Sequence, residues 1–118
     1  MVVDDNPAIR RALKTILEFT DDWVVCGEAV DGRDGIEKAK SLNPDLIVLD
    51  VSMPVMNGLE AARVLHQIMP EVPLILCSLH TDEVLRKEAS NAGVTAVISK
   101  AQNMQTLIYK ARELLGQN

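Results

Sequence analysis

The chain has 118 residues, 47% of them hydrophobic, which fits one domain with a buried core. Its formal net charge of -5 does not provide the basic surface that nucleic-acid binding requires, and no apolar run approaches the roughly 18–20 residues that span a bilayer. Because acids stand at Asp4 and Asp5, we expect no signal peptide. Cys26 and Cys77 lie in apolar runs, so we also expect buried thiols in a cytoplasmic protein.

The first half of the chain predicts two strands and two helices. Residues 1–3 form a short apolar strand, and Asn6 caps a helix that starts at Pro7. The apolar residues of this helix recur on one face, at Ile9, Leu13, Ile16 and Leu17. Residues 23–26 predict the second strand, and glycine turn signals within residues 31–35 precede the second helix.

The third strand is the centre of the pattern. Residues 46–49, with the sequence LIVL, form an unbroken apolar run, which predicts a strand buried on both faces. The strand ends at Asp50, and Asn57 then caps the third helix. An acid at the carboxyl end of a central parallel strand lies where open α/β sheets bind ligands. The alternative is that Asp50 is only a polar strand end.

The rest of the chain continues the alternation. Residues 74–77 predict the fourth strand, and Thr81 caps a fourth helix whose sparse apolar pattern makes it a candidate for motion. Residues 94–98 predict the fifth strand, and Asn103 caps the last helix. Five strands that alternate with five helices predict an α/β fold with a parallel sheet between two helical layers.

Polar residues follow four of the five predicted strands. Asp4 and Asp5 follow the first strand, Asp50 the third, Ser78 the fourth and Lys100 the fifth. The carboxyl ends of parallel strands meet at one edge, so we expect these side chains to lie together. Three neighbouring carboxylates repel one another, and Mg²⁺, which prefers hard oxygen ligands, would relieve the repulsion. A lysine and a hydroxyl beside them suit a phosphoryl group carried by a carboxylate nucleophile.

These motifs resemble the receiver domains of two-component response regulators, especially the subgroup with a helix-turn-helix output domain. The resemblance covers essentially the whole chain, through five segments: VVDDN at 2–6, IVLD at 47–50, SMPVMNG at 52–58, LCS at 76–78 and ISK at 98–100. It implies a flavodoxin-like, doubly wound (βα)5 fold with the strand order 2-1-3-4-5. It also implies that residues 1–118 form one receiver domain, with any output domain absent from the chain.

The resemblance implies a role for each matching residue. Asp50 would be the phosphoacceptor. Asp5 and Asp50 would ligate Mg²⁺ directly, with Mn²⁺ as a substitute, and the backbone carbonyl of Ser52 would be a third ligand. Asp4 would act through water, and Lys100 would pair with the phosphoryl group. The chemistry would rest on three side chains: Asp50, Ser78 and Lys100.

The resemblance also implies a switch. Ser78 would supply the switch hydroxyl, and Val97 stands where most receivers carry an aromatic switch residue. Ser52, Leu79 and His80 would flank the phosphoryl group and set the rate of its loss. Many relatives have a cis proline after the lysine, but this chain has Ala101, for which a trans bond is at least as favourable.

The expected partner is a sensor histidine kinase, which would donate the phosphoryl group from a phosphohistidine. Phosphorylation would change the surface of the fourth helix, the fifth strand and the fifth helix, and so control an output domain, transcriptional in this subgroup, or a partner protein. Homodimerisation on phosphorylation is a further expectation. The domain would catalyse only its own phosphorylation and slow dephosphorylation, and would bind neither nucleic acid nor membrane. Arg10 and Arg11 are expected on a solvated helix face that meets the kinase.

Three other classes fit parts of the pattern. A flavin-binding protein of similar architecture would need a Ser/Thr/Gly loop after the first strand, where Asp4 and Asp5 would repel a phosphate. A phosphatase with an aspartyl nucleophile would need a second acid at the position of Ser52. A pseudo-receiver that only binds proteins would be expected to have lost part of the site, which is complete here.

Overall fold

The computed structural model describes residues 1–20, 22–100 and 104–116. These residues form five strands, which are β1 (Val2–Val3), β2 (Glu28–Ala29), β3 (Ile47–Asp50), β4 (Leu74–Ser78) and β5 (Ala96–Ser99). The strands alternate with five helices in the described residues: α1 (Pro7–Glu18), α2 (Gly32–Leu42), α3 (Gly58–Ile68), α4 (Glu83–Asn91) and α5 (Gln105–Leu114). None of the described helices combines the length and apolar character needed to cross a membrane.

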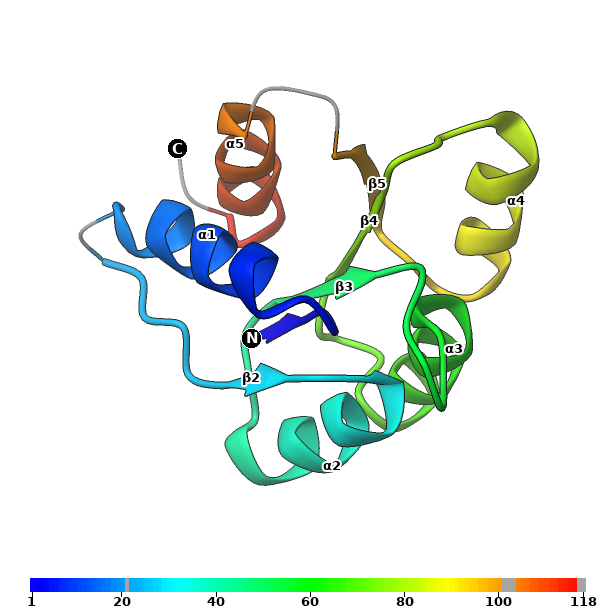
Figure 1. The fold of residues 1–118 in the computed structure, drawn as a ribbon. Coiled ribbons are helices and arrows are strands. Elements are labelled where there is room, and N and C mark those ends of the chain that lie inside the picture. The colour runs from blue at the N-terminus through cyan, green and yellow to red at the C-terminus, as the bar shows by residue number, and fades with distance from the viewer. Residues whose placement is uncertain (21, 101–103, 117–118) are drawn as a thin grey trace.

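All neighbouring strands are parallel, in the order β2-β1-β3-β4-β5, which confirms the predicted fold. Helices α1 and α5 cover one face of the sheet, and α2, α3 and α4 cover the other (Figure 1). Strand β3 is buried along its whole length, because Ile47 and Leu49 pack on the α2–α4 side and Val48 packs on the α1–α5 side. The acid that ends this strand is therefore held on a rigid element.

Side-chain caps begin four of the described helices. Asn6 caps α1 and Asn57 caps α3, as predicted, and Asn57 forms a capping box with Glu60. Helix α4 is capped by Asp82 rather than by the predicted Thr81. The predicted cap Asn103 and the Lys100–Ala101 peptide bond lie outside the described residues. The fourth cap is Asp31, whose side chain accepts from the backbone N–H of Asp34 at the start of α2.

The second strand differs from the prediction. It was expected at residues 23–26 but lies at Glu28–Ala29. Because β1 begins at Val2, which pairs with Glu28, residues 23–26 have no strand beside them on that edge. Cys26 is therefore exposed, and its predicted burial was wrong, whereas Cys77 in β4 is buried as expected. A strand needs a hydrogen-bonding neighbour as well as an apolar sequence.

The loop from β3 to α3 is closed tightly at its base. The backbone N–H of Gly58 donates to the carbonyl of Val51 over 3.1 Å. A Cβ atom at Gly58 would overlap the carbonyl oxygen of Asp50, so only glycine permits this close approach of α3 to the end of β3. The base of the loop thereby fixes the peptide that carries Asp50.

A strained turn lies at the top of the same loop. The N–H of Met56 donates to the carbonyl of Pro54 over 2.7 Å, so Val55 is the centre of a three-residue turn with a φ of +67°. A β-branched residue rarely adopts positive φ, and such strain costs about 1–3 kcal/mol. Asparagine tolerates this region of φ. We expect Val55→Asn to raise the melting temperature by about 4–8 °C for each kcal/mol of strain that it removes.

The matched control for this variant is Val24→Asn. Val24 is also exposed, but it is not among the non-glycine residues with positive φ in the described chain, which are Asn43 and Val55. Its replacement is expected to leave the melting temperature unchanged. A Val55→Asn protein that melts at or below the wild-type temperature would contradict the assignment of strain.

Candidate functional site

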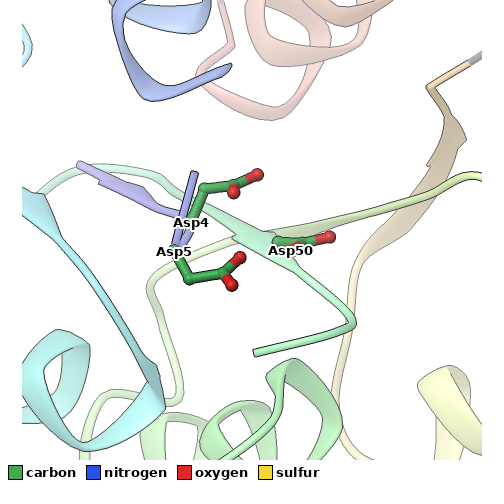
Figure 2. A group of neighbouring side chains, drawn as sticks. All are labelled: Asp4, Asp5 and Asp50. Atoms are coloured by element: carbon green, nitrogen blue, oxygen red, sulfur yellow. The ribbon is translucent and has the colours of Figure 1, made fainter. Parts of the chain in front are cut away.

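Three carboxylates meet at the carboxyl edge of the sheet. Asp4 and Asp5 follow β1, and Asp50 ends the neighbouring strand β3. Figure 2 shows the three side chains leaving these strand ends in the same general direction. One oxygen from each carboxylate lies within 4.8 Å of the others. Asp4 and Asp50 are buried, with exposed fractions of 1% and 6%, whereas Asp5 is exposed.

Lys100 bridges two of these acids from the end of β5. Its Nζ lies 2.8 Å from Oδ1 of Asp50 and 3.3 Å from Oδ2 of Asp4. The other oxygen of Asp4 accepts a hydrogen bond from the backbone N–H of Asn6 over 2.9 Å. Both oxygens of Asp4 are therefore engaged by the protein. Within the part of the chain that the structure describes, the Asp5 carboxylate has no such partner.

Burial and charge shift the titration of this cluster in definite directions. Burial raises the pKa of Asp4, with the charge of Asp50 adding to the effect and the Asn6 hydrogen bond and Lys100 opposing it. Burial alone would lower the pKa of Lys100, but its hydrogen bond to Asp50 and the two carboxylate charges outweigh burial and raise this pKa. Burial also raises the pKa of the Cys77 thiol to about 12, so this neighbour is no nucleophile at neutral pH.

The raised pKa of Asp4 predicts a pH dependence of stability. An acid whose pKa is higher in the folded than in the unfolded state lowers stability once the pH exceeds its unfolded value of about 3.9. In EDTA, we expect Asp4→Asn to have the melting temperature of the wild type near pH 3 and a higher melting temperature than the wild type at pH 7. The amide oxygen can still accept from the backbone of Asn6, so the loop is preserved. Thermal melts across this range check the prediction, and a variant that becomes less stable than the wild type as the pH rises would contradict it.

The donor set fits a hard divalent cation. Three carboxylate oxygens within 4.8 Å of one another are the ligand type and density that Mg²⁺ accepts, since it also keeps several waters. Asp5 and Asp50 offer oxygens toward the common space, whereas Asp4 already accepts hydrogen bonds through both of its own. The cluster can therefore hold a metal ion, with Asp4 better suited to contact through water.

Ser78 lies at the end of β4, one residue beyond the partner of Asp50 in the strand register. It is buried, and its hydroxyl donates to the carbonyl of His80 over 2.8 Å. The Ser78 carbonyl accepts from the backbone N–H of Lys100 over 2.8 Å, which ties the ends of β4 and β5 together. The hydroxyl thus links the sheet edge to the segment that leads into α4.

The remaining predicted residues surround this edge. Ser52 is exposed in the loop after β3, and Leu79 and His80 are exposed after β4. Val97 in β5 is half-buried, pairs with Leu76 in the register and packs against the core on the α2–α4 side. The structure brings Asp4, Asp5, Asp50 and Lys100 into one cluster, and among the described residues no hydrogen bond or ion pair joins that cluster to the side chains of Ser52, Leu79, His80 and Val97.

Sequence reasoning missed the part that Arg10 plays. It was expected on a solvated face with Arg11, but only 17% of its side chain is exposed. Its Nη1 donates to the carbonyl of Asp4, a member of the acid cluster, over 2.8 Å. No sequence spacing signals this contact, because it depends on the carbonyl of Asp4 and on Glu28 in the neighbouring strand β2.

Comparisons with known proteins identify the family of the chain. The family model of the response regulator receiver domain matches residues 1–112. Chemotaxis protein CheY of Thermotoga maritima is 37% identical over 100 residues, which cover 85% of this chain and 82% of the relative. A protein-glutamate methylesterase/protein-glutamine glutaminase of Methanosarcina acetivorans is 34% identical over 117 residues, and the match covers 98% of this chain and 33% of that protein. The chain thus spans about a third of the length of this methylesterase relative.

The solved structures give the same result. The crystal structure of the response regulator domain of Thermotoga maritima CheB superposes with a TM-score of 0.91 at 32% identity, covering 99% of this chain and 95% of that one. The receiver domain protein of Methanospirillum hungatei has a TM-score of 0.89 at 30% identity over 98% of this chain and 90% of its own. The family model covers most of the chain, the relatives match over most of its length, and the chain belongs to the response regulator receiver domain family.

Proposed function

We propose that Asp50 of this receiver domain accepts a phosphoryl group, in a Mg²⁺-dependent reaction, from the phosphohistidine of a sensor histidine kinase. The observation that carries the proposal is the position of Asp50. It ends the fully buried central strand, beside two further acids, with an ammonium group 2.8 Å from its Oδ1. A dedicated carboxylate nucleophile needs this kind of rigid, electrostatically balanced place.

In the proposed reaction, an oxygen of Asp50 attacks the phosphorus of the donor. The bond from this oxygen to phosphorus forms, and the P–N bond of phosphohistidine breaks, so that the imidazole leaves with the electron pair. In the free domain Lys100 neutralises the Oδ1 oxygen of Asp50. After the transfer, its ammonium group can pair with the negative charge of the phosphoryl group. Ser78 would donate its hydroxyl to the same group.

The proposed Mg²⁺ site lies at the carboxyl edge of the sheet, between Asp5 and Asp50. Asp5, Asp50 and the backbone carbonyl of Ser52 would ligate Mg²⁺, and Asp4 would contact it through water. A cation bound there supplies positive charge for the phosphoryl oxygens. Support comes from the donor set itself: Asp5 is exposed and unpartnered in the described chain, while both oxygens of Asp4 accept from protein donors.

The phosphorylated domain would act through α4, β5 and α5 on an output domain or a partner protein. Support for this surface comes from α4, in which Ala89 is the one fully buried residue of the described helix. A helix with so little buried apolar surface is the least costly element to displace. Transcriptional control through an attached domain is our preferred output, since DegU of Brevibacillus brevis, a transcriptional regulatory protein by name, is 32% identical over 92% of this chain.

The test of the proposed function is phosphorylation by a small donor. The protein is incubated with acetyl phosphate and Mg²⁺, and its intact mass is measured. We expect a gain of one phosphoryl group that EDTA prevents. A mass that stays unchanged with the metal present would favour a pseudo-receiver, which binds proteins without being phosphorylated.

The exposed side chain of Leu79 predicts a slow loss of the phosphoryl group. By the family resemblance residue 79 flanks the phosphoryl group, and the side chain of Leu79 is 68% exposed, so its bulk would hinder a water molecule that approaches the phosphorus in line. We expect Leu79→Ala to shorten the lifetime of the phosphorylated protein severalfold. The decay of the phosphorylated mass after removal of the donor measures this lifetime. Val84→Ala, at another exposed apolar residue, is the control, and an equal or longer lifetime for Leu79→Ala would show that residue 79 does not limit access.

A further inference from the structure

Arg10 in α1 contacts both the chain that follows β1 and strand β2. From the first part of α1, its Nη1 donates to the carbonyl oxygen of Asp4 over 2.8 Å. Its Nε lies 3.5 Å from Oε1 of Glu28 in β2. Only 17% of the Arg10 side chain is exposed. The guanidinium group therefore contacts a backbone oxygen and a carboxylate at once, which its planar, multiply donating shape allows.

The carbonyl that Arg10 contacts belongs to the peptide between Asp4 and Asp5. The other polar groups of Asp4 are held separately, because its N–H donates to Ala29 over 3.0 Å and its side chain accepts from Asn6. The Asp5 carboxylate has no partner within the described residues. Because a peptide unit is planar, the direction of the Asp4 carbonyl also sets the direction in which the chain continues to Asp5.

We propose that Arg10 is a positioning residue for Mg²⁺ binding, which holds the Asp4–Asp5 peptide so that the Asp5 carboxylate faces the space shared with Asp50. This inference rests on the proposed function. Arg10 acts on the site in two opposite ways. Its positive charge repels a cation, and its hydrogen bond orders a ligand. Glu28 lies beside the guanidinium group and offsets its charge, so the ordering effect dominates.

The experiment measures Mg²⁺ affinity by calorimetry, without any phosphodonor. We expect Arg10→Ala to weaken Mg²⁺ binding about 10–100-fold, which is the usual effect of losing a group that orients a metal ligand. Arg10→Lys keeps the charge but replaces the planar guanidinium fork by a single ammonium group, which fixes the direction of the Asp4 carbonyl less well, so we expect weaker binding there too. Arg10→Gln loses the charge but keeps an N–H donor, and we expect it to bind Mg²⁺ more tightly than Arg10→Ala. Arg11→Ala removes the exposed neighbouring charge and serves as the control.

A purely electrostatic effect of Arg10 would change the Mg²⁺ affinity of the variants in the opposite direction. If Arg10 acted only by repulsion, the Ala and Gln variants would bind Mg²⁺ more tightly than the wild type and the Lys variant would match it. That pattern, or unchanged affinity in all three variants, would overturn the inference. Thermal melts in EDTA identify any variant that fails to fold, in which case the Lys and Gln variants decide. A wild-type protein that binds no Mg²⁺ would instead overturn the proposed metal site itself, so the two failures are distinguishable.

Discussion

Replacing Asp50 is expected to abolish phosphorylation completely. Asp50→Asn replaces the nucleophilic carboxylate by a neutral amide while it keeps the shape of the side chain at the end of β3. The neighbouring acid Asp4 is not expected to take over, because hydrogen bonds to Asn6 and Lys100 engage its oxygens. Incubation with acetyl phosphate and Mg²⁺ should therefore leave the mass of the Asn variant unchanged, while the wild type gains one phosphoryl group.

The matched control is Asp45→Asn. Asp45 is exposed and lies at the opposite end of the same strand region, two residues before β3 begins. We expect this variant to be phosphorylated like the wild type. Melting curves should show both variants folded, because Lys100 retains Asp4 as a partner in the Asp50 variant. Phosphorylation that persists in Asp50→Asn would require another acceptor residue and would contradict the assignment of Asp50 as the phosphoacceptor.

Phosphorylation is expected to release the segment between β4 and α4. In the free domain the Ser78 hydroxyl donates to His80 and so holds the segment before α4. A phosphoryl group on Asp50 would compete for this hydroxyl and release the segment. Ala89 is the only fully buried residue of α4 in the described chain, so this helix is weakly anchored. We therefore expect beryllofluoride, a phosphoryl mimic, to shift the amide NMR signals of residues 78–92 strongly.

Strand β5 should respond weakly in the same experiment. Val97 packs against the core on the α2–α4 side, and as a β-branched residue it has few alternative rotamers. It also lacks the ring whose burial would favour a second state. We expect Ser78→Ala to remove most of the shifts at residues 78–92 while phosphorylation of Asp50 continues. Large shifts centred on Val97 that survive in Ser78→Ala would show a different switch.

The sequence predicted the convergence of the site because the prediction needed only strand order and direction. Each of Asp5, Asp50, Ser78 and Lys100 follows or ends an apolar run, and parallel strands bring such ends to one edge. The caps of α1 and α3 were predicted for a similar reason, since Asn6 and Asn57 act on their own neighbours in the chain. Local signals and a simple topology were sufficient for both.

Features that depend on distant partners were not predicted. The second strand was predicted at residues 23–26 but lies at Glu28–Ala29, because its position depends on where β1 can pair with it. The burial of Arg10 depends on Glu28 and on the carbonyl of Asp4, and no spacing rule for helices contains either contact. The strain at Val55 follows from the closed loop around it and not from its own conformational preference.

Chemical location of the phosphoryl group distinguishes Asp50 from its neighbouring acids. Borohydride reduces an aspartyl phosphate to homoserine, and tandem mass spectrometry of the digested protein then identifies the residue that carried the group. After incubation with acetyl phosphate and Mg²⁺, we expect homoserine at position 50 and unmodified Asp4 and Asp5. Homoserine at either of those two positions, or a phosphorylated protein without homoserine at position 50, would contradict the assignment of Asp50.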